Sequence, residues 1–408
     1  MSSYKTKLGG RILNLEHSKI ETTMKVSRSI IYAIVIITFL IAVKVIWMGC
    51  ATRYIDTVST EFKDVEGRSI YLHHSMNDGP EELLGNMPSM IGPQFQGEWA
   101  LYTCSMFSAA LTNLRILYPE HKTILTLLIS DAIEVALSPE LRKYDTERWG
   151  EDALETLDGD VSHISYLSHL AWMISGYKQS GGDDRYDDLY SRLCETMNRR
   201  ILESPILNLQ TYPREYIYVP DMLVAIVALA NYSRQNNGEY WSTVYAWLDE
   251  IKCHWIDEDS GLIRSFIPDG EVWIGILPAI GSYSALSCYY LTFIDEEFAK
   301  EQYELLKENF YKNGLIKGFK EHCDKDHRRG FNIDAGPILL GLSPTATAFA
   351  IGPATYFEDW EVRNKLLKTA ELAGFTVHKN GLRHYLLADF ALVGEAITLA
   401  MRTAVKWE

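Results

Sequence analysis

The spacing of apolar positions predicts a protein built mainly from α-helices. Beyond residue 97, apolar residues recur every three or four positions, and loops containing Gly, Pro or Asp separate these segments. The segments for which we expect helices are Glu98–Tyr118, Thr123–Leu137, Val161–Ser180, Tyr186–Glu203, Asp221–Gln235, Tyr240–Trp255, Pro278–Phe293, Glu296–Asn313, Ser343–Phe357, Trp360–Ala373 and Asp389–Thr403.

Consecutive segments differ in character, and this difference predicts how the helices pair. A helix of small and apolar residues, SALSCYYLTF, precedes a charged amphipathic one, EEFAKEQYELLKENFY, as an inner and an outer layer require. Six such hairpins need about twelve helices, which suits the length of 97–408. We therefore expect an all-α protein, an (α/α)6 barrel. Strand signals are few, and one short β-hairpin is expected, with Leu262–Phe266 and Glu271–Trp273 as its strands.

The N-terminal region contains an apolar run from Ile30 to Met48, IIYAIVIITFLIAVKVIWM, in which Lys44 is the only charge. Its length approaches the roughly 20 residues that cross a bilayer as a helix. We therefore expect a transmembrane anchor at 29–49 after a basic cytoplasmic tail at 1–28. By the positive-inside rule the barrel would then be extracytoplasmic in a single-pass membrane protein. The stretch 50–96 has weak periodicity and three prolines, which predicts a linker wrapping onto the barrel.

Two alternatives remain open for this run. Met48-Gly49-Cys50 weakly resembles a lipoprotein cleavage site, although Trp47 stands where a small aliphatic residue is expected. The run could also be a buried structural helix. A cleaved signal peptide is less favoured, because no small residues of the A-x-A kind follow.

Charge and composition narrow the classes of partner. With 39 Lys and Arg against 54 Asp and Glu, the net charge is -15, which disfavours binding to nucleic acid. The 24 Tyr, 14 Phe and 10 Trp favour a pocket for a small organic substrate. No nucleotide-binding or zinc motif occurs, and the six cysteines are widely scattered, so we expect neither a metal nor a cofactor. A homo-oligomer is compatible with the sequence.

The loop from Thr211 to Asp221 carries the clearest candidate chemistry, with two prolines, three tyrosines and two carboxylates. Asp221 stands where an apolar helix begins. It either caps that helix or points into an aromatic pocket, where desolvation would suit it to proton transfer near neutrality. Tyr216 and Tyr218 would then help bind substrate, and the alternative for both is core packing.

Other candidates lie elsewhere along the chain. His169 stands on an otherwise apolar helix and is either a core histidine or a proton-transfer group. Tyr166 and Trp172, on the same helix, are candidate substrate-binding residues. Asp334 lies in a loop bounded by Gly and Pro and is either a helix cap or an acid or base. Glu98, at the start of the first barrel helix, could form a carboxylate pair with Asp221.

Several of these segments together resemble the linalool dehydratase/isomerase family. The resemblance is carried by Trp149-Gly150, Ile164-Ser-Tyr-Leu-Ser-His169-Leu, Tyr177, Gly181 to Tyr186 and the Pro213 to Asp221 loop. It continues through Trp247-Leu-Asp-Glu, Ile256 to Gly261, Ser282-Tyr283, Asp334-Ala-Gly336 and Asp389. The resemblance implies an (α/α)6 barrel and cofactor-free acid/base catalysis. For the founding enzyme it implies isomerisation between geraniol and linalool and dehydration to myrcene.

The resemblance also assigns roles to single positions. His169 matches the family histidine, with Ser168 in place of the preceding glycine, and Tyr283 is similar to the family's pocket tyrosine. The family uses two cysteines near the positions of Thr211 and Asp221, and this chain has neither. A carboxylate therefore stands near the place of the second thiol.

Three functions follow as hypotheses. The first is a lyase or isomerase acting on a hydroxylated apolar substrate, with Asp221, His169 and Asp334 sharing the proton transfers and Tyr216, Tyr283 and Trp172 facing a developing cation. The second is a carbohydrate-active enzyme that uses Asp221 with Asp334 or with Glu98. The third is an anchored, non-catalytic binding domain, which predicts no cleft with converging ionisable groups.

Overall fold

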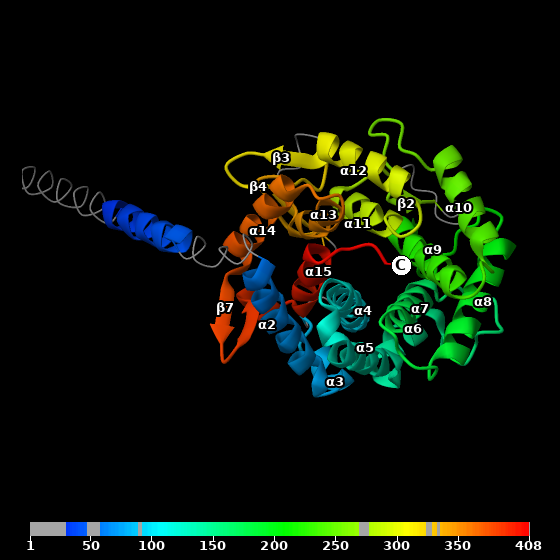
Figure 1. Ribbon diagram of the computed structural model, residues 1–408. Coiled ribbons are helices and arrows are strands. Elements are labelled where there is room, and N and C mark those ends of the chain that lie inside the picture. Colours follow the sequence, from blue (N-terminus) through cyan, green and yellow to red (C-terminus); the bar gives the residue numbers. More distant parts are fainter. Residues whose placement is uncertain are drawn as a thin grey trace, which may run out of the picture. The chain divides into compact units, whose positions relative to one another are not determined.

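The computed structural model describes residues 30–46, 58–88, 92–268, 277–323, 329–332 and 335–407. The chain divides into two compact units, Met1–Arg53 and Tyr54–Glu408, and Figure 1 shows the helices of both. The two units are described separately.

The membrane anchor predicted for the first unit is wrong. The helix described there runs over 30–46. Among the described residues, no helix combines the length and the apolar character needed to cross a membrane. The single-pass topology and the extracytoplasmic barrel, which both depended on this anchor, are withdrawn with it.

The second unit is mostly helical, as expected, and each of the eleven expected segments contains a helix. Their bounds are α4 Pro93–Leu117, α5 Lys122–Leu137, α7 Ile164–Gln179, α8 Asp187–Glu203, α9 Val219–Gln235, α10 Trp241–His254, α11 Gly281–Leu291, α12 Glu296–Phe310, α13 Pro344–Tyr356, α14 Trp360–Gly374 and α15 Leu392–Arg402. Three further α-helices, which the periodicity did not predict, are α2 Val58–Asn77, α3 Pro80–Gly85 and α6 Pro139–Trp149. Short 3-10 helices lie at Pro119–His121 and Leu386–Asp389.

Six helices form an inner ring. In order around the ring, α4 packs on α7, α7 on α9, α9 on α11, α11 on α13, α13 on α15, and α15 packs back on α4 (Figure 1). An outer helix accompanies each of them, namely α5, α8, α10, α12, α14 and α2. Because each inner helix is connected to the next through an outer helix, the N-terminal ends of the inner helices share one end of the ring.

The stretch that we expected to be a linker, 50–96, supplies the sixth outer helix. Helix α2 packs on α15 and on strand β8, and an ion-pair network holds it there. Asp64 of α2 accepts hydrogen bonds from Arg68, Arg383 and Arg402, and Arg68 also donates to Glu395 of α15 at 2.6 Å. Since charged side chains cover much of its inward face, α2 lacks the apolar periodicity of the other helices. Helix α6, PELRKYDTERW, was not predicted because most of its residues are polar.

The described strands form four antiparallel pairs rather than the one expected hairpin. They are β1 Ile217–Tyr218 with β2 Phe266–Ile267, β3 Tyr311–Asn313 with β4 Lys317–Phe319, β5 Arg329–Asn332 with β6 Gly336–Leu339, and β7 Thr376–Lys379 with β8 Leu382–Tyr385. Phe266, expected in the hairpin, pairs with Tyr218 of the preceding loop. The other expected strand, Glu271–Trp273, lies outside the described residues.

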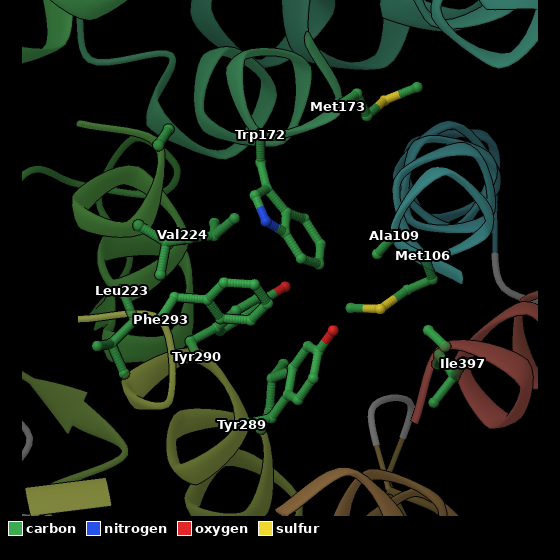
Figure 2. Packing of buried hydrophobic residues seen from close by; sticks show 14 of the residues in the cluster. Met106, Ala109, Trp172, Met173, Leu223, Val224, Tyr289, Tyr290, Phe293 and Ile397 are labelled. Atoms are coloured by element: carbon green, nitrogen blue, oxygen red, sulfur yellow. The ribbon is translucent and has the colours of Figure 1, made fainter. Parts of the chain in front are cut away.

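Aromatic residues fill the interior of the ring (Figure 2). Trp172 of α7 has ring contacts with Tyr289, Tyr290 and Phe293. The chain returns to this core after α15, where the indole of Trp407 stacks on Trp172 at 5.9 Å and donates to Asn113 at 2.8 Å. Trp407 and Phe293 both follow the C-terminal ends of inner helices. The tail therefore packs toward the end of the ring opposite the helix N-termini.

Candidate functional site

The candidate site lies at the N-terminal ends of the inner helices. Asp221 belongs to the first turn of α9, Tyr283 to the first turn of α11, and Glu98 and Tyr102 to the first half of α4. Glu98 and Tyr102 are four residues apart and therefore share one face of α4. The fold thus gathers at one end of the ring residues that are far apart in the sequence.

Asp221 is 5% exposed, and its Oδ1 accepts a hydrogen bond of 2.9 Å from the hydroxyl of Tyr102. The N-cap position of α9 is occupied by Tyr218, not by Asp221. The carboxylate thus bonds to α4, the second inner helix along the ring from its own. This geometry favours the interpretation of Asp221 as a site residue over that of a helix cap.

Tyr102 is a permanent donor to this carboxylate. Burial, and next the negative charge of Asp221, raise the pKa of Tyr102 well above its ordinary value of 10. The hydroxyl therefore keeps its proton throughout the physiological range and remains available to the carboxylate oxygen. Tyr102 was not among the residues expected from the sequence. Its spacing of four residues from Glu98 is the signal that could have identified it.

His169 lies in the second turn of α7, fully buried beside Tyr102, with ring centroids 4.3 Å apart. Its Nδ1 is 2.7 Å from Oγ of Ser105, a further α4 residue that the sequence did not single out. Burial lowers the pKa of His169 to about 3. The imidazole is therefore neutral near pH 7, and so low a pKa makes it a weak base that acts mainly through hydrogen bonds.

Arg148, at the end of α6, organises the outer part of the site. Its guanidinium lies 3.7 Å from Oε2 of Glu98 and 3.5 Å from Oε1 of Glu215, and it stacks 3.5 Å above the ring of Tyr212. Burial, and next the charge of Glu98, raise the pKa of Tyr212 well above 10, with a smaller contribution from Asp221. Arg148 directly precedes the Trp149-Gly150 motif, but no pattern in the sequence predicted that Arg148 would be a site residue.

These residues border a recess of about 480 Å³. Its lining residues are Gln94, Arg148, Trp149, Tyr212, Pro213, Arg214 and Glu215. Two aromatic residues, two arginines and a carboxylate therefore meet in one depression, and Glu98 is reached from it through Arg148. A surface of this kind can bind a polar organic molecule by stacking and by hydrogen bonds.

The tyrosines expected to bind substrate lie in an aromatic group around Phe266. Its ring centroid is 6.0 Å from that of Tyr216, 5.6 Å from that of Tyr218 and 5.2 Å from that of Tyr283. The hydroxyl of Tyr218 also donates to Oε2 of Glu215 at 3.0 Å, which connects this group to the lining of the recess. The pair of strands β1 and β2 holds the group together.

The remaining expected residues are placed differently. The hydroxyl of Tyr166 donates to the carbonyl of Ala136 on the outer helix α5, so Tyr166 does not join the site. Trp172 was expected to face a developing cation, but it is buried in the aromatic core of the ring and stacks on Trp407. Asp334 lies outside the described residues, and its role stays a prediction.

Comparison with known proteins finds a solved structure with a similar fold. No family model matches the chain. A solved structure of a glycoside hydrolase from family 105 of C. acetobutylicum is similar, with a TM-score of 0.50 over 73% of this chain and 92% of that chain. What the two share is the fold. At 11% sequence identity the likeness extends no further. The resemblance to the linalool dehydratase/isomerase family remains a prediction.

Proposed function

We propose that this chain is a carbohydrate-active enzyme, a glycoside hydrolase or a related enzyme, built on an (α/α)6 barrel. The inner ring with its outer helices and the similarity to a family 105 glycoside hydrolase both support this architecture. In such a barrel we expect the substrate at the end of the ring where Asp221, Glu98 and the recess lie.

The observation that carries the proposal is that two carboxylates, Asp221 and Glu98, both lie near Tyr102. Its hydroxyl donates to Asp221, and Glu98 precedes it by one helical turn on the same face of α4. The charges of both carboxylates contribute to the raised pKa of Tyr102, with that of Asp221 the larger. Most glycoside hydrolases use a pair of carboxyl groups that flank the glycosidic bond.

The surroundings of the two carboxyl groups suggest different roles. Glu98 lies beside the guanidinium of Arg148, which favours its ionised form. We therefore assign to Glu98 the part of a general base or nucleophile. Asp221 is more deeply buried and receives its hydrogen bond from a neutral hydroxyl. We assign to Asp221 the part of the acid that protonates the leaving oxygen.

The aromatic residues complete this assignment. Sugar rings present C–H faces that pack on aromatic rings, while their hydroxyl groups need donors and acceptors. Trp149 and Tyr212 line the recess together with Arg148 and Glu215, which offer both kinds of contact.

The proposal is tested with Asp221→Asn in the full chain, assayed on a panel of aryl glycosides and oligosaccharides. We expect turnover to fall by at least about a hundredfold, because the amide cannot donate the proton. Asp295→Asn is the matched control, since Asp295 caps α12 in the outer layer by accepting from the backbone of Phe298 at 3.0 Å. Full activity in a folded Asp221→Asn protein would remove Asp221 from the mechanism. Asp334→Asn in the same assay tests the other carboxylate pair.

Dehydration or isomerisation of a terpene alcohol is the second candidate function. It is favoured by the electron-rich group of Tyr218, Phe266 and Tyr283. Geraniol and linalool therefore belong in the same assay. Conversion of these alcohols without any glycan turnover would favour the terpene-alcohol function over the carbohydrate function.

A non-catalytic binding domain receives less support. That alternative predicts no cleft with converging ionisable groups. Arg148, Glu98 and Glu215 converge at the recess instead.

A further inference from the structure

Three polar groups deep in the ring have no hydrogen-bond partner among the described residues. They are Nε2 of His169, Nε1 of Trp172 and the hydroxyl of Tyr290. Each of these side chains is at most 1% exposed. Two other buried tyrosines are paired, since Tyr166 donates to the carbonyl of Ala136 and Tyr190 to that of Ala228, whereas the hydroxyl of Tyr289, beside Trp172, also lacks a partner among the described residues.

The three groups are neighbours on the inner helices α7 and α11. The ring centroid of Trp172 lies 5.3 Å from that of Tyr290 and 6.4 Å from that of His169. Figure 2 shows the hydroxyl of Tyr290 pointing toward the middle of the packed residues, on the side of Trp172. The unpartnered groups therefore form one cluster rather than three separate defects.

This cluster adjoins the proposed site. Burial is the largest cause of the raised pKa of Tyr290, and the charge of Asp221 adds to it. Tyr102, which donates to Asp221, contacts His169 from the other side, with ring centroids 4.3 Å apart. His169 is thus separated by one side chain, Tyr102, from the carboxylate that we assign as the acid.

Polar groups that are buried without a hydrogen-bond partner lower the stability of the folded protein. The great majority of buried polar groups in folded proteins are paired, because a buried group without a partner loses its hydrogen bonds to water. Three together are therefore expected to serve a ligand. Their chemistry also restricts that ligand. An indole N–H only donates, a phenol donates or accepts, and a neutral imidazole nitrogen does one or the other.

A hydroxyl group suits this combination, because its oxygen accepts from the indole while its proton can go to the imidazole or the phenol. An ammonium group would find no acceptor at Trp172, and none of the three groups carries a positive charge that would bind an anion. We propose that His169, Trp172 and Tyr290 form a subsite for a hydroxyl group of the substrate bound against Asp221. This inference rests on the proposed function and defines the part of the sugar that enters the ring.

The test is a crystal structure of the full chain, without ligand and after soaking with glycerol, D-glucose or D-galactose. We expect a ligand hydroxyl within hydrogen-bond distance of at least two of the three groups, displacing any water found there in the unsoaked crystal. A water that stays in place beside a bound sugar would overturn the proposal. So would pairing of the three groups with protein atoms, or crystals in which none of the three probes binds.

A binding measurement accompanies the structure. Tyr290→Phe removes one hydroxyl and keeps the aromatic packing, and we expect it to weaken the binding of the same sugar about tenfold by calorimetry. Tyr166→Phe is the matched control, because its hydroxyl is equally buried but faces α5, so sugar affinity should not change. Equal affinity of Tyr290→Phe and the parent protein would refute the subsite. Neither the crystal structure nor the binding measurement requires turnover. Failure of the subsite can therefore be distinguished from failure of the glycosidase assay.

Discussion

Tyr102 on α4 and Asp221 on α9 are joined by a hydrogen bond of 2.9 Å between helices that are not neighbours in the inner ring. Helix α7, which lies between them along the ring, carries His169 against the ring of Tyr102. Three inner helices therefore meet at one pair of side chains, and the chemistry that we propose depends on this meeting.

Tyr102→Phe should lower turnover by at least about tenfold, because Asp221 loses the donor that orients it. The loss of unfolding free energy should be about 1 kcal/mol. Tyr303→Phe is the matched control, since Tyr303 also donates to an aspartate, Asp359, at 3.0 Å, but in the outer layer. Steady-state kinetics and chemical denaturation of both variants distinguish the two roles. An equal effect of the two substitutions on turnover would argue against the orienting role of Tyr102.

Arg148→Met should reduce turnover more at pH 6 than at pH 8. Without the guanidinium, Glu98 loses the charge that favours its ionised form, so a higher pH is needed to restore the carboxylate. The pH dependence of kcat measures this shift. Arg185→Met serves as the control, because Arg185 is half exposed and pairs with Asp183 on the surface. A uniform loss of activity at every pH would show that Arg148 acts only by shaping the recess.

The buried histidine should make the protein sensitive to acid. The pKa of His169 is lowered from 6.5 to about 3 by burial, so below pH 6.5 the unfolded chain binds a proton that the folded protein does not. The free energy of unfolding should therefore fall as the pH drops from 6.5 toward 3, by up to about 1.4 kcal/mol per pH unit from this group. His169→Gln should show a shallower fall in denaturation experiments. His254→Gln, which changes an exposed histidine, should keep the slope of the parent protein.

Asp64→Ala should destabilise the protein by about 3–5 kcal/mol, because it leaves the guanidinium groups of Arg68, Arg383 and Arg402 buried without their shared carboxylate. Burial alone would raise the pKa of Asp64, but Arg68 and Arg402 outweigh it and hold that pKa below its usual 3.8. The contribution of Asp64 is therefore present above pH 3.8 and is lost at lower pH.

Chemical denaturation at pH 7 tests the role of Asp64. Asp160→Ala removes a carboxylate that is 92% exposed and should change stability by less than about 0.5 kcal/mol. A similarly small effect of Asp64→Ala would mean that α2 is only loosely attached to the ring.

Apolar periodicity was a good guide wherever a helix buries apolar side chains. The helices α4, α7, α9, α11, α13 and α15 have extensive apolar surface, and their outer partners α8 and α12 have clear amphipathic stripes. It failed for α2 and α6, because α2 is held largely by ion pairs and α6 exposes a polar surface. It also predicted a membrane anchor in the N-terminal run, and no helix among the described residues is long and apolar enough to be one.

The candidate site was predicted in part. Asp221, His169, Glu98 and Tyr218 were expected from local patterns and Tyr283 from the family resemblance, and the structure places all of them at the same end of the ring. Tyr102 and Arg148 were missed, because their importance lies in contacts with residues far away in the sequence. Tyr166 was expected at the site but faces α5, since its position on α7 points it outward.

By itself the sequence determined the class of the fold and the alternation of inner and outer helices, because both follow from side-chain polarity along single helices. Only the tertiary structure decided that Asp221 meets Tyr102, that Arg148 faces Glu98, and that Trp172 and Tyr290 present unpartnered polar groups to the interior. These relationships join residues separated by about fifty or more positions. They arise when the ring closes and brings the helix ends together, so no local pattern encodes them.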